Sequence, residues 1–254
     1  MLTRARIQLI KSLSDKAARL ESGLFVVEGR KMVGEALASD ANVESVYLSA
    51  DVSEDILPVQ SRVAPERVTA KEMERISHLR TPSDVLAVVA MPRGHAANAL
   101  HRRGLTLCLD GVQDPGNLGT IIRIADWFGI GRVLCSPDSA DCYNPKVVQA
   151  TMGAIFRVTV WYGELEKVLT DFAVQGGNIY GTFLEGDDMY GTELSQDGVI
   201  VMGSEGRGIS PQVARMVNRK LFVPPFPAGR HGSESLNVAA ATAVVCAEFR
   251  RRAR

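Results

Sequence analysis

The chain has 254 residues, of which 46% are hydrophobic and 23% charged. This composition is typical of soluble globular proteins and excludes a disordered, collagen-like or coiled-coil chain. Its 29 basic and 29 acidic residues give a formal net charge of zero, so the chain has no general attraction for polyanions, and any contact with nucleic acid must come from local patches. The length allows one large domain or two of moderate size.

Cysteine use and hydropathy indicate a cytoplasmic protein. The four cysteines are Cys108, Cys135, Cys142 and Cys246. They form no CxxC pair and three of them lie in apolar runs, which argues against a disulfide framework or a zinc site. The first residues lack the long apolar core and cleavage site of a signal peptide. Because no run reaches 18 apolar residues, we expect no membrane span.

The first part of the chain alternates helical and extended patterns. Apolar residues at helical spacing predict one amphipathic helix over residues 3–20. Strands are predicted at 24–29, 43–49 and 85–92, and helices at 32–39 and 71–77. This alternation predicts an α/β layer structure. The polar segment 92–104 contains Pro and Gly and lacks periodicity. We interpret it as a linker and predict two domains, 1–98 and 99–254.

The second part repeats the alternation more strongly. The predicted strands are 105–112, 131–136, 157–162, 178–184, 198–203 and 220–226, and the predicted helices are 117–130, a short one from Asn144-Pro145, 165–173, one that starts near Pro211, and 235–249. Trp127 and Trp161 lie in apolar surroundings, so we expect core or dimer-interface positions for both. The four histidines are scattered without ligand spacing, and we therefore expect no metal site.

Three clusters contain residues that could bind a ligand or take part in catalysis. The first, Asp114-Pro115-Gly116-Asn117-Leu118-Gly119, joins a strand to a helix, and such a turn presents free N–H groups to a ligand. Arg123 follows one turn later on the polar face. Alone, a capped helix with a solvated arginine would also explain this pattern.

The second cluster follows a buried strand, and the third precedes the Ala-rich last helix. Gly203-Ser204-Glu205-Gly206-Arg207-Gly208 contains three glycines, but it is neither a dinucleotide fingerprint nor a Walker loop. A tight structural turn is its simplest alternative. The third cluster runs from Val223-Pro224-Pro225 to Ser235-Leu236-Asn237, where a helix cap is the simplest alternative.

Together and in this order, the three clusters resemble the signature motifs of the SpoU (TrmH) family, which are SPOUT-superfamily RNA 2′-O-ribose methyltransferases. The matching residues are Asn117, Gly119 and Arg123, then Gly203, Glu205, Gly206 and Gly208, then Pro224 and Ser235 to Val238. The run 25–29 after a basic helix resembles the family's smaller RNA-binding domain, of the ribosomal-protein L30e type. The resemblance implies a C-terminal α/β domain with a trefoil knot and a mostly parallel sheet.

The resemblance also implies a cofactor, S-adenosylmethionine, held in the knot by three loops. The residues expected to bind it are Thr182, Phe183, Leu184, Gly203, Glu205, Gly206, Gly208, Val223, Pro224, Ser235, Leu236 and Asn237. The distance from Pro224 to Ser235 exceeds the family's usual spacing, because residues 225–232 lengthen this loop. The insertion leaves open whether Arg230 or His231 touches substrate.

The family assigns activation of the ribose hydroxyl to the first motif's arginine, here Arg123. A guanidinium is rarely deprotonated, so Arg123 is either that base or a cation that stabilises the alkoxide electrostatically or orients the adjacent phosphate. Asn117, Glu205, Ser235 and Asn237 are the other residues implied at the catalytic centre, where Glu205 fixes Asn117 or Arg123 or contacts the cofactor.

The resemblance implies RNA as partner, with ribosomal RNA favoured over transfer RNA, and a homodimer. Both chain ends are basic: Arg4, Arg6, Lys11, Lys16 and Arg19 lie near the start, and Arg250, Arg251, Arg252 and Arg254 near the end. They offer phosphate contacts on a neutral chain, although a solvated helix face is the plain alternative. Two other functions stay open: a knotted RNA-binding protein without catalysis that acts in ribosome assembly, and an α/β module for another nucleotide.

Overall fold

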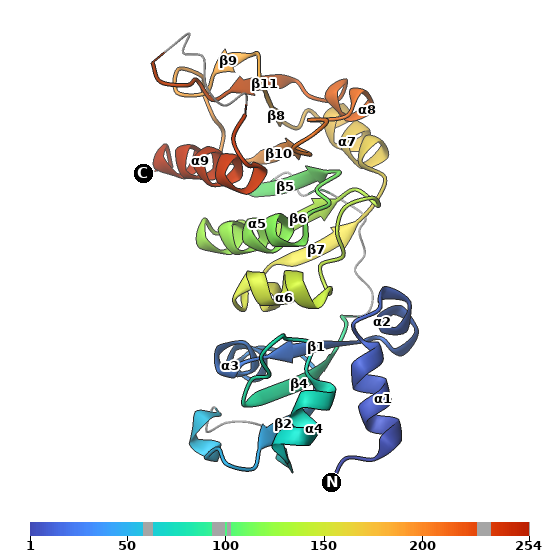
Figure 1. The fold of residues 1–254 in the computed structure, drawn as a ribbon. Helices are drawn as coiled ribbons and strands as arrows, with labels where there is room; N and C mark the ends of the chain where they lie inside the picture. The colour runs from blue at the N-terminus through green and yellow to red at the C-terminus, as the bar shows by residue number, and fades with distance from the viewer. Residues whose placement is uncertain (58–62, 93–99, 101–102, 228–234, 254) are drawn as a thin grey trace. The chain divides into compact units, whose positions relative to one another are not determined.

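A computed structural model describes residues 1–57, 63–92, 100, 103–227 and 235–253. Within them the chain forms two compact units, each with its own sheet (Figure 1). Unit 1 contains residues 1–94 together with 141–157, and unit 2 contains 95–140 together with 158–254. Most of the predicted linker 92–104, with His95 and His101, lies outside the described residues. In the described part, no helix is long and apolar enough to cross a membrane.

Unit 1 is a four-stranded sheet with helices. Its elements are α1 Arg4–Ser12, α2 Lys16–Ser22, β1 Leu24–Glu28, α3 Arg30–Ala38, β2 Val43–Ser49, the 3₁₀ turn η1 Glu54–Ile56, β3 Pro65–Val68, α4 Ala70–Ile76, β4 Val85–Ala90, α6 Pro145–Thr151 and the 3₁₀ turn η2 Ala154–Phe156. The strand order is β1-β4-β2-β3, in which β4 runs antiparallel to β1 and β2, and β3 pairs parallel to β2. The predicted alternation of elements is therefore confirmed, with β3 as an additional short edge strand.

The single helix predicted over residues 3–20 is wrong. Helix α1 ends at Ser12, and α2 starts at Lys16 after a turn. Asp15 has an extended backbone, and its Oδ1 accepts from the amide of Ala17 at 2.7 Å, which makes it the N-cap of α2. A capping aspartate inside a periodic apolar pattern therefore begins a second helix.

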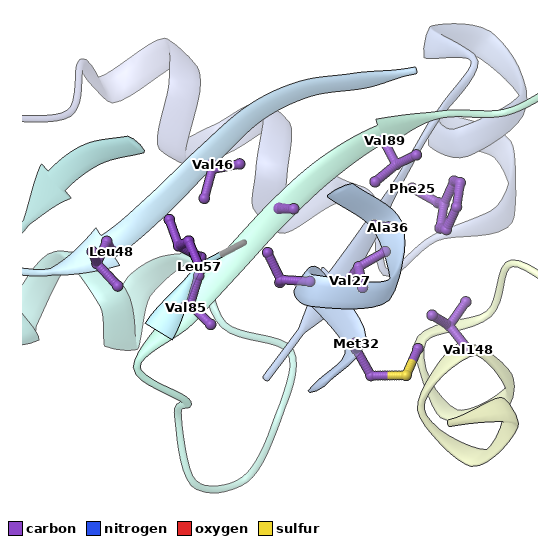
Figure 2. Packing of buried hydrophobic residues seen from close by; sticks show 12 residues of the cluster. Phe25, Val27, Met32, Ala36, Val46, Leu48, Leu57, Val85, Val89 and Val148 are labelled. Carbon is purple, nitrogen blue, oxygen red and sulfur yellow. The ribbon is translucent and has the colours of Figure 1, made fainter. Parts of the chain in front are cut away.

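The segment 141–157 lies in the sequence between two strands of unit 2 but packs into unit 1. Val148 of α6 belongs to the same hydrophobic cluster as Phe25 and Met32 (Figure 2). The ring of Tyr143 lies 4.8 Å from that of Phe25. Asp141 pairs with Arg19 at 2.5 Å, and Arg157 pairs with Glu35. Apolar packing and two ion pairs thus fasten this segment to unit 1.

Unit 2 is built on a seven-stranded sheet. Its elements are β5 Leu105–Asp110, α5 Pro115–Trp127, β6 Arg132–Cys135, β7 Thr159–Tyr162, α7 Leu165–Val174, β8 Ile179–Phe183, β9 Asp187–Asp188, β10 Gly198–Gly203, α8 Pro211–Ala214, β11 Arg219–Phe222 and α9 Val238–Arg251. The strand order is β7-β6-β5-β10-β8-β11-β9, and every neighbouring pair is parallel. The predicted α/β fold with a mostly parallel sheet is confirmed. The trefoil knot stays a prediction.

The helices of unit 2 pack in two pairs. Helix α5 packs against α9, and α7 packs against α8 (Figure 1). The core between sheet and helices includes Cys108, Leu134, Phe172, Ile179 and Val201, all nearly inaccessible to solvent. This core fixes the strand ends, and the candidate site lies beyond them.

Candidate active site

The strand order brings the first two sequence clusters together. From β5 the chain continues outward through β6 and β7, and it later returns to place β10 on the other side of β5. A parallel sheet binds ligands at such a reversal, outside the carboxyl ends of the strands. Gly203 at the end of β10 is the register partner of Asp110 at the end of β5. The loops that follow these two strands therefore start side by side.

The first loop leads directly into α5. Asp114 is the N-cap, and its Oδ1 accepts from the amide of Asn117 at 2.7 Å. Pro115 occupies the first turn, where its missing N–H costs nothing. The helix start is therefore rigidly built, and it holds the half-buried Asn117 toward the second loop.

The three glycines of the second loop have three different roles. A Cβ on Gly203 would lie 2.1 Å from the carbonyl carbon of Gly208, so no side chain fits there. Gly208 has φ +67°, a conformation that favours glycine. Mutual backbone hydrogen bonds between Ser204 and Gly208, 3.1 and 2.8 Å long, close the turn. Gly206 has no such requirement, because a Cβ there would meet nothing within 4 Å. Its position faces open space, as a ligand would require.

Glu205 joins all three clusters. Its Oε1 accepts from Asn117 Nδ2 at 3.2 Å, from Asn237 Nδ2 at 2.5 Å and from the amide of Val238 at 3.2 Å. Asn237 Nδ2 also donates to Asn117 Oδ1 at 2.9 Å. The carboxylate thereby lies at the N-terminus of α9, where the helix dipole favours negative charge. We call Asn117, Glu205 and Asn237 the amide–carboxylate network.

The third cluster reaches this network through the cap of α9. Asn237 Oδ1 accepts from the amides of Ala239 and Ala240 at 3.0 and 3.2 Å. Ser235 and Leu236, just before it, are exposed, with Leu236 at 52%. Among the described residues, the side chain of Ser235 makes no hydrogen bond with the network. Residues 228–234, including Arg230 and His231, lie outside the described part of the chain.

The remaining predicted cofactor residues follow neighbouring strands at the same edge of the sheet. Thr182 and Phe183 end β8, and Leu184 follows with 67% exposure. Val223 and Pro224 come directly after β11, which pairs with β8. The ammonium group of Lys220 lies 5.4 Å from the centre of the Phe183 ring, a cation–π contact that orients the ring. Apolar side chains thus rim the edge that the network occupies.

Arg123 stands apart from the network. It is exposed on α5, six residues or about 9 Å along the helix axis from Asn117. It makes no ion pair or side-chain hydrogen bond with any residue that the structure describes. Trp127, one turn further, is 84% exposed, so of its two expected positions the core is excluded and the dimer interface stays a prediction, whereas Trp161 is buried. An exposed cation and an exposed indole therefore share one face of α5.

Several terminal arginines are used inside the protein instead of forming basic patches. Arg250 donates to the carbonyls of Phe128 and Gly129 and so caps the end of α5. Arg251 and Arg252 pair with Glu248, and their hydrogen bonds lower the pKa of that carboxyl to about 2. Arg19 is buried near the other end. Arg254 lies outside the described residues. These contacts leave Arg250, Arg252 and Arg19 little capacity to bind phosphate, whereas the side chain of Arg251 is 66% exposed.

Two polar residues near the site were not predicted. Asp110 accepts from the amide of Ser210 at 2.7 Å and so anchors the far end of the glycine loop. Asp138, after β6, accepts from Ser136 at 2.6 Å and from Arg207 at 3.3 Å. The hydrogen bond from Ser136 lowers the pKa of Asp138 below its usual range. Their only sequence signal is a position at or just past a strand end.

The described residues contain no group of three His, Cys, Asp or Glu side chains placed to hold a metal ion. All four cysteines are buried, and none of them forms a disulfide. Burial raises the pKa of Cys246 to about 12 and that of Cys108 further. These thiols are therefore neutral packing residues.

The fold and site define a parallel α/β protein whose three polar loops converge beyond β5 and β10. Residues 104–247 match the SpoU rRNA Methylase family, and residues 4–87 match the MRM3-like substrate binding domain. The chain belongs to the SpoU rRNA methylase family.

Relatives match over nearly the whole chain. The 23S rRNA (guanosine(2553)-2'-O)-methyltransferase RlmP of Bacillus subtilis (strain 168) is 30% identical over 242 residues, which is 94% of each chain. Among solved structures, a TrmH-family protein from Porphyromonas gingivalis is 41% identical, with a TM-score of 0.86 and coverage of 99% of both chains. An AdoMet-bound rRNA methyltransferase from Sinorhizobium meliloti is 28% identical, with a TM-score of 0.83 and coverage of 99% of this chain and 96% of that chain.

Proposed function

We propose that this protein transfers a methyl group from S-adenosylmethionine to the 2′-hydroxyl of a ribose in RNA, with ribosomal RNA as the substrate class. One observation carries the proposal: Glu205 Oε1 binds residues of the first and third motifs at once. Three motifs that are far apart in sequence thus share one hydrogen-bonded site. The names of the Bacillus and Sinorhizobium relatives support ribosomal RNA and the cofactor.

The residues around the network fit S-adenosylmethionine. The space beside Gly206 is open, whereas Gly203 and Gly208 are glycines for reasons internal to the loop. The exposed side chains of Leu184 and Leu236 offer apolar contact to the flat adenine base of the cofactor. Val223 is half-buried and directly follows β11, the strand that pairs with β8. We assign cofactor binding to Thr182, Phe183, Leu184, Gly203, Glu205, Gly206, Gly208, Val223, Pro224, Ser235, Leu236 and Asn237.

S-adenosylmethionine, when bound, supplies an electrophilic methyl group on a positively charged sulfur. The protein's own contribution is to position the ribose oxygen and to assist loss of its proton. The network keeps the loop 203–208 and the start of α9 in fixed relation, because one carboxylate oxygen holds both. Ser235 is exposed beside this network and is available to the substrate.

Arg123 is the residue we assign to the reacting hydroxyl. Its guanidinium has no competing carboxylate among the described residues, so its charge is available to an alkoxide or a phosphate. Its distance from Asn117 along α5, and the exposed Trp127 beside it, support a homodimer in which this helix face meets a second copy. We also propose a cytoplasmic location, which four cysteines without a disulfide support.

The test is transfer of labelled methyl from S-adenosylmethionine to unmodified ribosomal and transfer RNA transcripts, followed by alkaline hydrolysis. We expect an alkali-resistant labelled dinucleotide, because a methylated 2′-oxygen cannot attack the adjacent phosphate. Label in alkali-labile mononucleotides would contradict ribose methylation. Cofactor binding without transfer, on transcripts and on ribosomal particles, would favour the non-catalytic RNA-binding function. No cofactor affinity at all would favour a module for another nucleotide.

A further inference from the structure

We propose that Arg207 binds a phosphate of the substrate RNA beside the active site, and that Asp138 holds its guanidinium in place before RNA binds. The inference rests on the proposed function, because it concerns how the same site holds its substrate. Arg207 is the cation of the glycine loop, between Gly206 and Gly208 and two residues after Glu205. It is not among the residues that the family motifs assign.

The backbone of Arg207 is fixed while its side chain is not buried. Its amide donates to Ser204 Oγ at 3.2 Å inside the turn that Ser204 and Gly208 close. Its side chain is 71% exposed. A rigid backbone with an exposed guanidinium presents a charge at a defined place without ordering a whole loop on binding.

The guanidinium lies over the ends of β5 and β6. Its Nη2 is 3.3 Å from Asp138 Oδ2 and 3.2 Å from the position of a Cβ on Gly111, the residue that follows β5. Asp138 is itself held, because its Oδ1 accepts from Ser136 Oγ, which also accepts from the amide of Gly111 at 2.8 Å. Arg207 is therefore poised at the edge of the sheet that carries the network.

The ion pair between Arg207 and Asp138 contributes little to the stability of the fold. Both side chains are more than half exposed, and ion pairs of this kind contribute little to stability. Arg207 Nη2 is the side-chain donor that contacts Asp138, and a guanidinium has five N–H donors, so most of its capacity is unused. On a chain with zero net charge, binding of RNA depends on such local cations.

The experiment compares Arg207→Ala, Asp138→Ala and the control Arg215→Ala. Arg215 is similarly exposed at 66%, belongs to the same unit and pairs with Glu166 at 3.9 Å. The probe is an unmodified large-subunit ribosomal RNA transcript, bound without cofactor at about 50 to 200 mM salt. S-adenosylmethionine affinity and methyl transfer are measured on the same samples.

For Arg207→Ala we expect RNA affinity to fall about tenfold and the salt slope to decrease by about one ion, with a matching rise in KM and kcat within twofold. Asp138→Ala should leave the salt slope unchanged and shift RNA affinity by less than about threefold, because the lost positioning contact is offset by the loss of a carboxylate that competes with phosphate. Arg215→Ala should change neither RNA affinity nor the salt slope. S-adenosylmethionine affinity should stay within about twofold in all three variants.

An unchanged salt slope and affinity in Arg207→Ala would overturn the proposal. The proposal would also be overturned if Asp138→Ala lost as much RNA affinity and salt slope as Arg207→Ala, because the ion pair would then act only by holding the loop in place. Failure of the proposed function has a different signature. The unsubstituted protein would then show no S-adenosylmethionine affinity or no methyl transfer, while the RNA-binding comparison would still report on Arg207.

Discussion

Two polar networks join distant segments of this chain, one in each unit, and they differ in burial. In unit 1, Arg19 has a side chain only 2% exposed and donates to the carbonyls of Leu13 and Ser14 and to Asp141. In unit 2, the amide–carboxylate network of Asn117, Glu205 and Asn237 lies at the surface. The first fastens segment 141–157 to unit 1, and the second fastens three loops around open space.

The difference in burial separates stability from function. A buried charge must be paired inside the protein, and removing its partner is costly. An exposed network is also hydrated by water, which a ligand can replace at little cost. We therefore expect substitutions in the buried network to change the free energy of unfolding, and substitutions around the exposed network to change cofactor affinity or turnover.

The largest expected effect concerns a residue that neither network holds. Arg123→Ala should lower the rate of methyl transfer at least about 1,000-fold, because it removes the charge assigned to the developing alkoxide. S-adenosylmethionine affinity should stay within about threefold. Single-turnover transfer and calorimetric titration check the two quantities. Retained turnover would exclude Arg123 as the central catalytic residue.

The next largest effect concerns the buried network of unit 1 and the free energy of unfolding. Asp141→Ala should destabilise unit 1 by about 3 kcal/mol, because it leaves the buried Arg19 without its counter-charge. The matched control is Asp84→Ala, whose partner Arg30 is 57% exposed and whose loss should cost less than about 1 kcal/mol. Urea unfolding measures both. Equal effects would show that burial does not distinguish the two pairs.

A third substitution probes the open side of the glycine loop. Gly206→Val should weaken S-adenosylmethionine binding at least about tenfold, or about 1.4 kcal/mol, because its side chain would fill space that the protein leaves free. Gly131→Val is the control, since Gly131 also lacks neighbours within 4 Å and has no positive φ. If both variants bind the cofactor normally, the loop does not line its site.

The smallest expected effect is a pH dependence of unit 1. Burial lowers the pKa of His78, whose Nε2 lies 2.9 Å from the carbonyl oxygen of Ile10 and whose buried Nδ1 has no hydrogen-bond partner among the residues that the structure describes. The unfolded chain, with an ordinary histidine pKa near 6.5, therefore binds the proton first as pH falls. Stability should decrease as pH falls below about 6.5 and level off below the folded pKa, by at most about 1.4 kcal/mol per pH unit.

Unfolding of the unsubstituted protein and of His78→Gln at neutral and mildly acidic pH measures this dependence. The glutamine keeps a donor for the carbonyl of Ile10 but does not titrate. We expect a smaller loss of stability on acidification in His78→Gln. Equal losses would assign the pH dependence to other groups.

Local sequence patterns predicted most elements but not how they assemble. Strands such as 43–49 were predicted to the residue, because alternating apolar residues and flanking turns are local signals. The interruption between α1 and α2 at Asp15 was missed, because this N-cap residue lies within a stretch whose apolar residues keep helical spacing without a gap. The insertion of β10 beside β5 and the return of 141–157 to unit 1 depend on long-range packing, which a local pattern does not encode.

The site was predicted as three motifs, and the structure adds how they are connected. The sequence left open whether Glu205 fixes Asn117, fixes Arg123 or contacts the cofactor. In the structure Glu205 accepts from Asn117 and from the start of α9, while Arg123 is elsewhere on α5. The sequence also left open whether Trp127 lies in the core or at a dimer interface, because an apolar residue near a helix end has the same pattern in both cases, and its exposure excludes the core.

The most direct test of the comparison measures S-adenosylmethionine affinity and the free energy of unfolding in Glu205→Ala and Asp141→Ala. Glu205→Ala should lose cofactor affinity at least about tenfold, because Val238 and Asn237 are released from the loop, while unfolding changes by about 1 kcal/mol or less. Asp141→Ala should lose stability and keep its cofactor affinity. Unchanged affinity in Glu205→Ala would contradict the assignment of the exposed network to the active site.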